Sequence, residues 1–382
     1  MIYLRCSSII FPDRVITDGA VIIDGEKIAA AGPAAEIHKP LGLETVDAHG
    51  LHLAPGYIDW QLNGGFGLDF SENPSNMWQT GECLPEHGVT SFLPTIISSP
   101  LEIYKTAQEN IQHGKPANYT GAQPLGLHFE GPYLNPEKKG AHNPRHLRKP
   151  DLAEIANWTR KQGVWVVTLA PELPHADDMI RFLSSENVIV SAGHSMASYE
   201  QAMASIDLGV SAATHLFNAM PGLDHRTPGL AAACIQSGKV TAGIIPDGIH
   251  VHPAMVNLAW RTKQHGMIAI VTDAMTALGM PPGTYGLGDF EVIVDESSAR
   301  LKNGTLAGSI LRMDQAVRNM MTFCGCSLPE AVNSASLNAA RLIKAPHKGR
   351  ILTGADADLV LLDAEAAVIS TFVRGRKVFS KI

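Results

Sequence analysis

Four residues with metal-binding or proton-transfer chemistry stand where apolar runs of the sequence end: Glu130, His194, His215 and Asp273. One histidine after a strand is usually an ordinary polar residue, and one aspartate there is often a helix N-cap. Together they suggest more, because two neutral imidazoles and a carboxylate form a ligand set for a catalytic divalent ion with one position open for water. We therefore expect Glu130, His194 and His215 to bind a single metal ion.

Asp273 has a different expected role from the three ligands. A divalent ion lowers the pKa of a bound water from about 16 toward about 7. A carboxylate beside that water can accept its proton and later give it to a leaving group. The hypothesis is metal-assisted hydrolysis with Asp273 as general base and acid.

The apolar runs predict the scaffold that would bring these residues together. Short, continuous apolar segments alternating with helix-length stretches indicate βα units around a parallel sheet. Eight such runs over this length are typical of a (β/α)8 barrel, in which the carboxyl ends of the strands meet at one face. A doubly wound sheet is the rival, but no G-x-G-x-x-G follows the first run. The runs are Leu51–Trp60, Val89–Thr95, Pro124–Glu130, Val164–Pro171, Asn187–His194, Val210–His215, Val240–Asp247 and Met267–Asp273.

Both ends of the chain read as β-hairpins. Asp24-Gly25 separates two apolar runs near the start, and residues 357–363 and 371–379 repeat that logic near the end. We predict that residues 1–52 and 348–382 form one small β-sandwich domain, and that residues 53–347 form the (β/α)8 TIM-type barrel. Two independent β-caps remain the alternative.

Composition excludes several classes of protein. A net charge of −7 over 382 residues argues against a nucleic-acid or anionic-membrane partner. Five scattered cysteines form no disulfide framework, and no signal peptide or membrane span is visible. We expect a cytoplasmic enzyme. The 16 histidines are more than such a composition suggests, which fits metal ligation and proton transfer.

The motifs carry a family resemblance. PGYID at 55–59, DGEKI at 24–28 and GADADLV at 354–360 resemble the amidohydrolase superfamily of metal-dependent barrels. LHFEGPY at 127–133, KGAHNP at 139–144, SAGHS at 191–195, THLFNAM at 214–220 and VTDA at 271–274 resemble its N-acetylglucosamine-6-phosphate deacetylase family. The resemblance implies a hydrolase of a linear amide bond that releases acetate from an N-acetylated amino-sugar phosphate. Its setting would be amino-sugar catabolism and cell-wall amino-sugar recycling.

One position departs from the superfamily pattern. Most members carry His-x-His after the first strand and bind a second metal there, whereas this chain has Gln61 and Asn63. Amides ligate transition metals poorly compared with imidazole. We treat Gln61 and Asn63 as a possible remnant of a second site and expect one ion per subunit. Zinc is preferred, and iron, cobalt, manganese or nickel also fit the ligand set.

The resemblance also implies the substrate contacts. His250 would polarise the acetyl carbonyl and His142 would contact the sugar. Arg226 would bind phosphate across a dimer interface, which implies a homodimer. The other implied contacts are Ala141, Asn218 and Ala219, with Leu306, Ala307 and Gly308 along the sugar pocket.

Three alternatives stay open from sequence alone. An N-acetylgalactosamine-6-phosphate deacetylase would differ at one hydroxyl of the substrate. A cyclic-amide hydrolase is disfavoured, because such enzymes keep His-x-His and usually a carbamylated lysine, whereas the third run ends in Glu130. A non-catalytic binding protein is suggested by Gln61 and Asn63, but it would not need all four residues of the proposed site.

Overall fold

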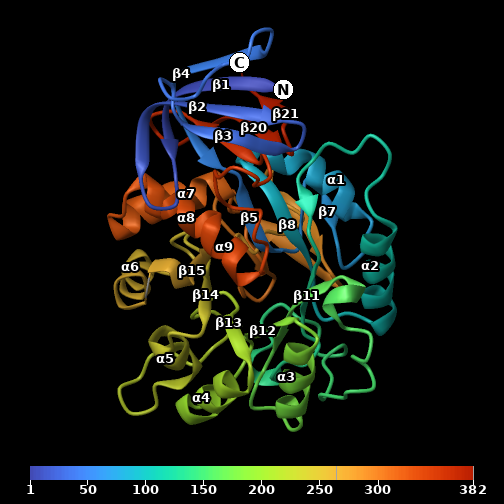
Figure 1. The fold of residues 1–382 in the computed structure, drawn as a ribbon. Coiled ribbons are helices and arrows are strands. Elements are labelled where there is room, and N and C mark those ends of the chain that lie inside the picture. The colour runs from blue at the N-terminus through green and yellow to red at the C-terminus, as the bar shows by residue number, and fades with distance from the viewer. Residues whose placement is uncertain (264, 382) are drawn as a thin grey trace.

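The computed structural model describes residues 1–263 and 265–381 and divides into a barrel and a smaller sheet. Figure 1 shows the smaller sheet, drawn in blue and red, at one end of the barrel, with both chain termini in it. The predicted fold class, a (β/α)8 barrel with a small β domain built from both ends, is confirmed.

The barrel consists of parallel strands in the order β15-β14-β13-β12-β11-β10-β8-β5. It closes where β5 meets the chain after β15, since Asn63 N donates to Ala274 O at 2.8 Å and Asp273 N donates to Gln61 O at 3.0 Å. The strands are β5 (Tyr57–Leu62), β8 (Val89–Ile96), β10 (Leu127–Glu130), β11 (Val164–Leu169), β12 (Ile189–Ala192), β13 (Val210–Ala213), β14 (Thr241–Ile244) and β15 (Ile268–Ile270). A two-residue strand, β9 (Gln123–Pro124), pairs with β8.

Helices surround most of the barrel. They are α1 (Asn76–Cys83), α2 (Leu101–His113), α3 (Ala176–Ser185), α4 (Tyr199–Leu208), α5 (Gly229–Gln236), α6 (Pro253–Thr262), α7 (Met313–Cys324), α8 (Leu328–Ala335) and α9 (Leu337–Leu342). No described helix has the length and apolarity that a membrane crossing requires. Short 3-10 turns lie at Leu84–His87, Pro136–Lys138, Arg160–Gln162 and His265–Met267.

The connection from β10 to β11 departs from the regular βα pattern. Within the described residues it contains 3-10 turns but no α-helix. The four prolines at positions 132, 136, 144 and 150 disfavour a helix over that part of the connection, because proline breaks the hydrogen bonding of a helix interior. The resulting loop lies over the carboxyl ends of the strands, where Asn135 N donates to His194 O at 2.9 Å.

The small domain is one continuous seven-stranded sheet in the order β21-β20-β19-β4-β1-β2-β3. Leu359 of β19 lies opposite Pro55 of β4, which joins the two ends of the chain. Its strands are β1 (Ile2–Ile10), β2 (Val15–Asp24), β3 (Lys27–Pro33), β4 (Glu44–Pro55), β19 (Leu359–Leu362), β20 (Val368–Val373) and β21 (Arg376–Ser380).

The first apolar run belongs to two strands rather than one. Its start lies in β4 of the small sheet and its end lies in β5 of the barrel. The break falls at Gly56, where an added Cβ would lie 2.2 Å from Thr90 Oγ1. A continuous apolar run in the sequence does not show where the chain leaves one sheet for the other, because the residues on both sides of the break are buried.

A three-stranded antiparallel insertion between β15 and α7 has no counterpart among the predicted elements. It comprises β16 (Gly283–Leu287), β17 (Phe290–Val294) and β18 (Ala299–Leu301). A separate apolar cluster, which includes Ile97, Met275 and Leu287, packs it against the barrel. Two short strands, β6 (Gly64–Gly65) and β7 (Leu68–Asp69), pair after β5.

Candidate active site

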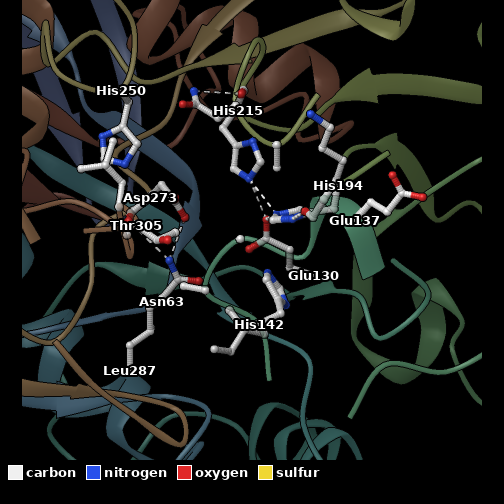
Figure 2. A pocket seen from close by; sticks show the side chains of 18 residues that line it. Asn63, Glu130, Glu137, His142, His194, His215, His250, Asp273, Leu287 and Thr305 are labelled. Atoms are coloured by element: carbon white, nitrogen blue, oxygen red, sulfur yellow. Dashed lines mark hydrogen bonds and ion pairs between the residues drawn. The ribbon is translucent and has the colours of Figure 1, made fainter. Parts of the chain in front are cut away.

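The predicted chemistry-bearing residues line a cavity of about 270 Å³ at the carboxyl ends of the barrel strands. This is near the lower end of the range for small-molecule sites. Figure 2 shows Glu130, His142, His194, His215, His250 and Asp273 around the cavity. Its other lining residues are Asn63, Ile97, Glu137, Lys138, Gly140, Ala141, Asn218, Ala219, Leu287, Thr305, Leu306 and Gly308.

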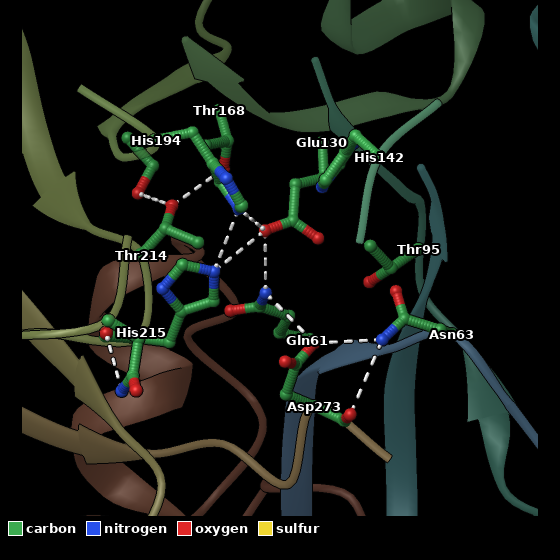
Figure 3. A network of polar contacts seen from close by, with 12 residues as sticks. Gln61, Asn63, Thr95, Glu130, His142, Thr168, His194, Thr214, His215 and Asp273 are labelled. Carbon is green, nitrogen blue, oxygen red and sulfur yellow. Dashed lines mark hydrogen bonds and ion pairs between the residues drawn. The ribbon is translucent and has the colours of Figure 1, made fainter. Parts of the chain in front are cut away.

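Three potential metal ligands converge on one point. Glu130 Oε1 lies 3.1 Å from His194 Nε2 and 3.0 Å from His215 Nε2, and the two nitrogens are 3.1 Å apart. Ligands at about 2.0–2.1 Å from a tetrahedral ion are about 3.3 Å from one another, so this triangle matches one face of such a site. Figure 3 shows the three groups facing one another. The donor set therefore fits a divalent metal ion.

The hydrogen bonds around the two histidines differ. His194 Nδ1 lies 2.8 Å from the Lys138 carbonyl, which can only accept, so Nδ1 carries the proton and the Nε2 lone pair faces Glu130. His215 Nδ1 is buried without a hydrogen-bond partner. The protein therefore fixes the ligating form of His194 directly, whereas His215 is oriented by its strand and by Glu130.

The charges at this point reinforce one another. Burial tends to raise the pKa of Glu130, but its contacts with the adjacent imidazoles of His194 and His215 hold that pKa well below its usual range. Burial also tends to lower the pKa of His215, and the adjacent Glu130 outweighs it and raises that pKa. Glu130 is thus an ionised carboxylate, the form in which it binds a cation.

The backbone at the strand ends is unusual in the same places. His194 has φ 50°, His215 has φ 28° and Asp273 has φ 49°. Positive φ is uncommon for residues other than glycine, and such conformations concentrate at functional sites. The chain therefore turns locally just after each of these strands, at the residue whose side chain lines the cavity.

A buried polar layer lies beneath the ligands. Thr168 Oγ1 lies 2.7 Å from His128 Nε2 and 2.6 Å from Thr214 Oγ1, and Thr214 Oγ1 also lies 2.6 Å from Ser191 Oγ. Burial lowers the pKa of His128 to about 4, so this ring is neutral. The layer fills the barrel interior with paired polar groups and supports Thr214, the neighbour of His215.

The opposite side of the cavity is lined by Asn63 and Asp273, and the fully buried amide of Gln61 contacts it from outside the lining. Gln61 Nε2 donates to Glu130 Oε1 at 3.1 Å and to Asp273 Oδ1 at 3.2 Å. Asn63 Nδ2 donates to the same Asp273 oxygen at 2.8 Å. Both amides therefore turn N–H groups toward the carboxylates, which holds Asp273 in place, while the oxygens Gln61 Oε1 and Asn63 Oδ1 are buried without a hydrogen-bond partner.

Asp273 has the environment of a group that exchanges protons near neutral pH. Burial and the nearby charge of Glu130 raise its pKa to about 6. The preceding residue, Thr272, donates from Oγ1 to Asp59 Oδ2 at 2.5 Å. This hydrogen bond connects the segment after β15 to β5. Burial raises the pKa of Asp59 to about 7.

His142 can donate a hydrogen bond to a ligand. Ser98 N donates to His142 Nδ1 at 3.2 Å, so Nδ1 is an acceptor and the proton lies on Nε2. Burial and the neighbouring His194 lower the pKa of His142 to about 3, which keeps the ring neutral.

His250 is held by the carboxylate of Asp247. His250 Nδ1 lies 2.6 Å from Asp247 Oδ2, and Asp247 Oδ1 accepts from the backbone N–H groups of Ile249 and His250. Burial tends to raise the pKa of Asp247, but the hydrogen bond from His250 outweighs it and lowers that pKa. The ionised Asp247 thus fixes the ring orientation of His250.

Two predicted substrate contacts lie apart from the cavity lining. Arg226 is exposed in the loop before α5, and Ala307 is fully buried in the cluster under the insertion. Prediction from sequence missed six lining residues: Ile97, Glu137, Lys138, Gly140, Leu287 and Thr305. Gly140 lies within the KGAHNP motif at 139–144, and Glu137 and Lys138 come just before it, so the motif and its neighbours were the available signal. Leu287 and Thr305 belong to the unpredicted insertion and its connection.

The Amidohydrolase family model matches residues 52–378. N-acetylglucosamine-6-phosphate deacetylase of Danio rerio is 42% identical over 88% of this chain and 86% of its own length. The protein of the same name from Bacillus subtilis is 35% identical over 97% and 96%. The chain belongs to the amidohydrolase family. Within that family it groups with the N-acetylglucosamine-6-phosphate deacetylases, as its motifs suggested.

Solved deacetylase structures have the same fold as this amidohydrolase over nearly the whole chain. N-acetylglucosamine-6-phosphate deacetylase from Pasteurella multocida has a TM-score of 0.92 and 33% identity, covering 98% of this chain and 99% of its own. The Mycobacterium smegmatis deacetylase, as a mutant in complex with N-acetyl-D-glucosamine-6-phosphate, has a TM-score of 0.91 and 31% identity, covering 99% of each. The barrel and the terminal sheet are thus a shared architecture of these amidohydrolases.

Proposed function

We propose that this amidohydrolase hydrolyses N-acetyl-D-glucosamine 6-phosphate to D-glucosamine 6-phosphate and acetate. The observation that carries the proposal is the convergence of Glu130, His194, His215 and Asp273 at one cavity. The identity to deacetylases over most of the chain supports the choice of substrate. We place the enzyme in the cytoplasm, with residues 53–347 as its catalytic barrel and residues 1–52 and 348–382 as its small domain.

Glu130, His194 and His215 would hold one divalent ion, for which zinc is our preferred identity. When bound, such an ion acts as a Lewis acid and lowers the pKa of a coordinated water. The amides of Gln61 and Asn63 direct N–H groups at Glu130 and Asp273, and amides ligate transition metals poorly compared with imidazole. One ion per subunit is therefore the expected stoichiometry.

Asp273 transfers the proton in the proposed reaction. Its carboxylate accepts a proton from the attacking water and returns it to the amine nitrogen as the amide C–N bond breaks. Gln61 and Asn63 hold Oδ1 in position for this role. Since His250 Nδ1–H is paired with Asp247, the doubly protonated ring is the form that donates from Nε2 to the acetyl carbonyl oxygen, and His142 Nε2–H donates to the sugar.

The remaining substrate contacts complete the proposal. Ala141, Leu306 and Gly308 flank the sugar, and Ala307 supports that loop from beneath. Asn218 and the backbone of Ala219 bind the phosphate. Arg226, which is exposed on its own subunit, extends to the phosphate in the neighbouring subunit of a homodimer.

The decisive assay is acetate release from N-acetylglucosamine 6-phosphate by chelated protein, restored with one ion at a time among zinc, iron(II), cobalt, manganese and nickel. We expect chelation to stop turnover and zinc to restore it. Absence of acetate with every ion would overturn the function. A competition with N-acetylgalactosamine 6-phosphate tests the epimer, and faster turnover of that sugar would replace the proposed substrate.

A further inference from the structure

The phosphate end of the cavity contains one cationic side chain that the proposed contacts do not include. Among the described residues that line the cavity, Lys138 is the one lysine or arginine. Three carboxylates, those of Glu130, Glu137 and Asp273, also line it. Even with a divalent ion bound, the cavity's own charges leave no surplus of positive charge for a dianionic phosphate. A cation near that end is therefore needed for tight binding.

Lys138 is fixed beside the segment proposed to bind phosphate. Its Nζ donates to the carbonyl of Met220 at 3.1 Å. Met220 directly follows Asn218 and Ala219, which line the same cavity. This contact uses one of the three N–H groups of the ammonium, so the others can donate to a ligand.

The backbone of Lys138 anchors the metal side at the same time. Its carbonyl accepts from His194 Nδ1 at 2.8 Å. The 3-10 turn Pro136–Lys138 sets this position, since the Asn135 side chain accepts from Glu137 N at its start. The Glu137 carboxylate points away from His142 and His215 in Figure 2. Lys138 therefore reaches from the metal ligand His194, which its backbone carbonyl contacts, to Met220, which its ammonium contacts.

We propose that Lys138 is a specificity-determining residue that binds the 6-phosphate of the substrate from within the same subunit. This inference rests on the proposed function and adds a cation to the phosphate contacts named there. Lys138 makes each subunit's cavity selective for an anionic sugar before any residue of a partner contributes.

The test compares Lys138→Gln, Lys138→Arg and the control Lys139→Gln on N-acetylglucosamine 6-phosphate and on N-acetylglucosamine. Lys139 has the same charge and loop but does not line the cavity. We expect Lys138→Gln to raise KM for the phosphorylated sugar by about 10–100-fold, the range for a hydrogen bond to a charged group. KM for the neutral sugar, kcat and metal content should change less than about 3-fold. Arginine should restore most of the loss, and Lys139→Gln should behave as wild type.

Calorimetric titration with inorganic phosphate gives a second readout that needs no turnover. Lys138→Gln should weaken phosphate binding by a similar factor, and Lys139→Gln should not. Equal losses on both sugars, or unchanged KM and phosphate affinity, would overturn the inference. Wild-type protein that binds phosphate through Lys138 but releases no acetate would instead refute the proposed function alone.

Discussion

The two sides of the cavity use similar polar residues in opposite ways. On the ligand side, formed by Glu130, His194 and His215, acceptor atoms converge within 3.1 Å of one another. On the amide side, formed by Gln61, Asn63 and Asp273, N–H groups point at a carboxylate. Converging acceptors require a cation, whereas a carboxylate that receives N–H donors is already paired. The difference assigns metal binding to one side and proton transfer to the other.

The strongest test of this division removes a ligand. His215→Ala should lower metal content after dialysis below about a tenth of an equivalent and lower turnover by about 10³-fold, because metal assistance supplies several kcal/mol. Elemental analysis and an acetate assay measure both. His225→Ala is the matched control, since that histidine is exposed and lies outside the cavity. Full metal content in His215→Ala would contradict the assignment of metal binding to the ligand side.

Removing the carboxylate of Asp273 on the amide side should lower activity without lowering metal binding. Asp273→Asn should lower kcat by about 10²–10⁴-fold, the usual contribution of a general acid–base. Metal content should stay at the wild-type level, because Asp273 is not a ligand in this arrangement. Near-normal kcat would exclude Asp273 as the base, and loss of metal would make it part of the ligand side.

Gln61 is the residue that connects the two sides, because its Nε2 donates to both Glu130 and Asp273. Gln61→Leu should weaken metal affinity by about 10–100-fold, as the loss of a ligand's hydrogen-bond partner typically does. Competition with a chromophoric chelator measures the affinity. An unchanged affinity would mean that Glu130 is positioned by the two histidines alone.

The smallest expected effect is a shift in pH dependence. The hydrogen bond from Asn63 lowers the pKa of Asp273, so Asn63→Leu should raise it. A general base is active only when ionised, so the acid limb of kcat/KM should move to higher pH, by about one unit. Rates above the limb should change only a few-fold. A shift to lower pH would contradict the role of Asn63 as a donor to Asp273.

The barrel was predictable because its strands are buried on both faces and therefore read as continuous apolar runs. The same reasoning failed where a run crosses from β4 into β5, since burial looks identical in either sheet. It also missed the insertion Gly283–Leu301, whose strands are short and partly exposed. Local patterning identifies buried strands well and identifies small exposed antiparallel strands poorly.

The candidate site was predictable to a similar extent. Glu130 ends a strand, and His194, His215 and Asp273 lie shortly after the ends of theirs, so barrel geometry predicts that the four meet. Lys138 and Leu287 lie in loops, where no periodic pattern indicates which cavity a side chain lines. Gln61 and Asn63 could be recognised in the sequence because they replace the His-x-His of the superfamily. Their role depends on which end of each amide faces Asp273, which the sequence does not show.

By itself, the sequence determined the donor types and the alternation of buried strands, since these follow from residue chemistry and from local burial. The tertiary structure decided what each group does. Closure of the barrel places Gln61 and Asn63 against Asp273, more than two hundred residues later, and turns their N–H groups into donors. A long loop places Lys138 between His194 and Met220. Such contacts arise from chain closure over long separations, which no local pattern encodes.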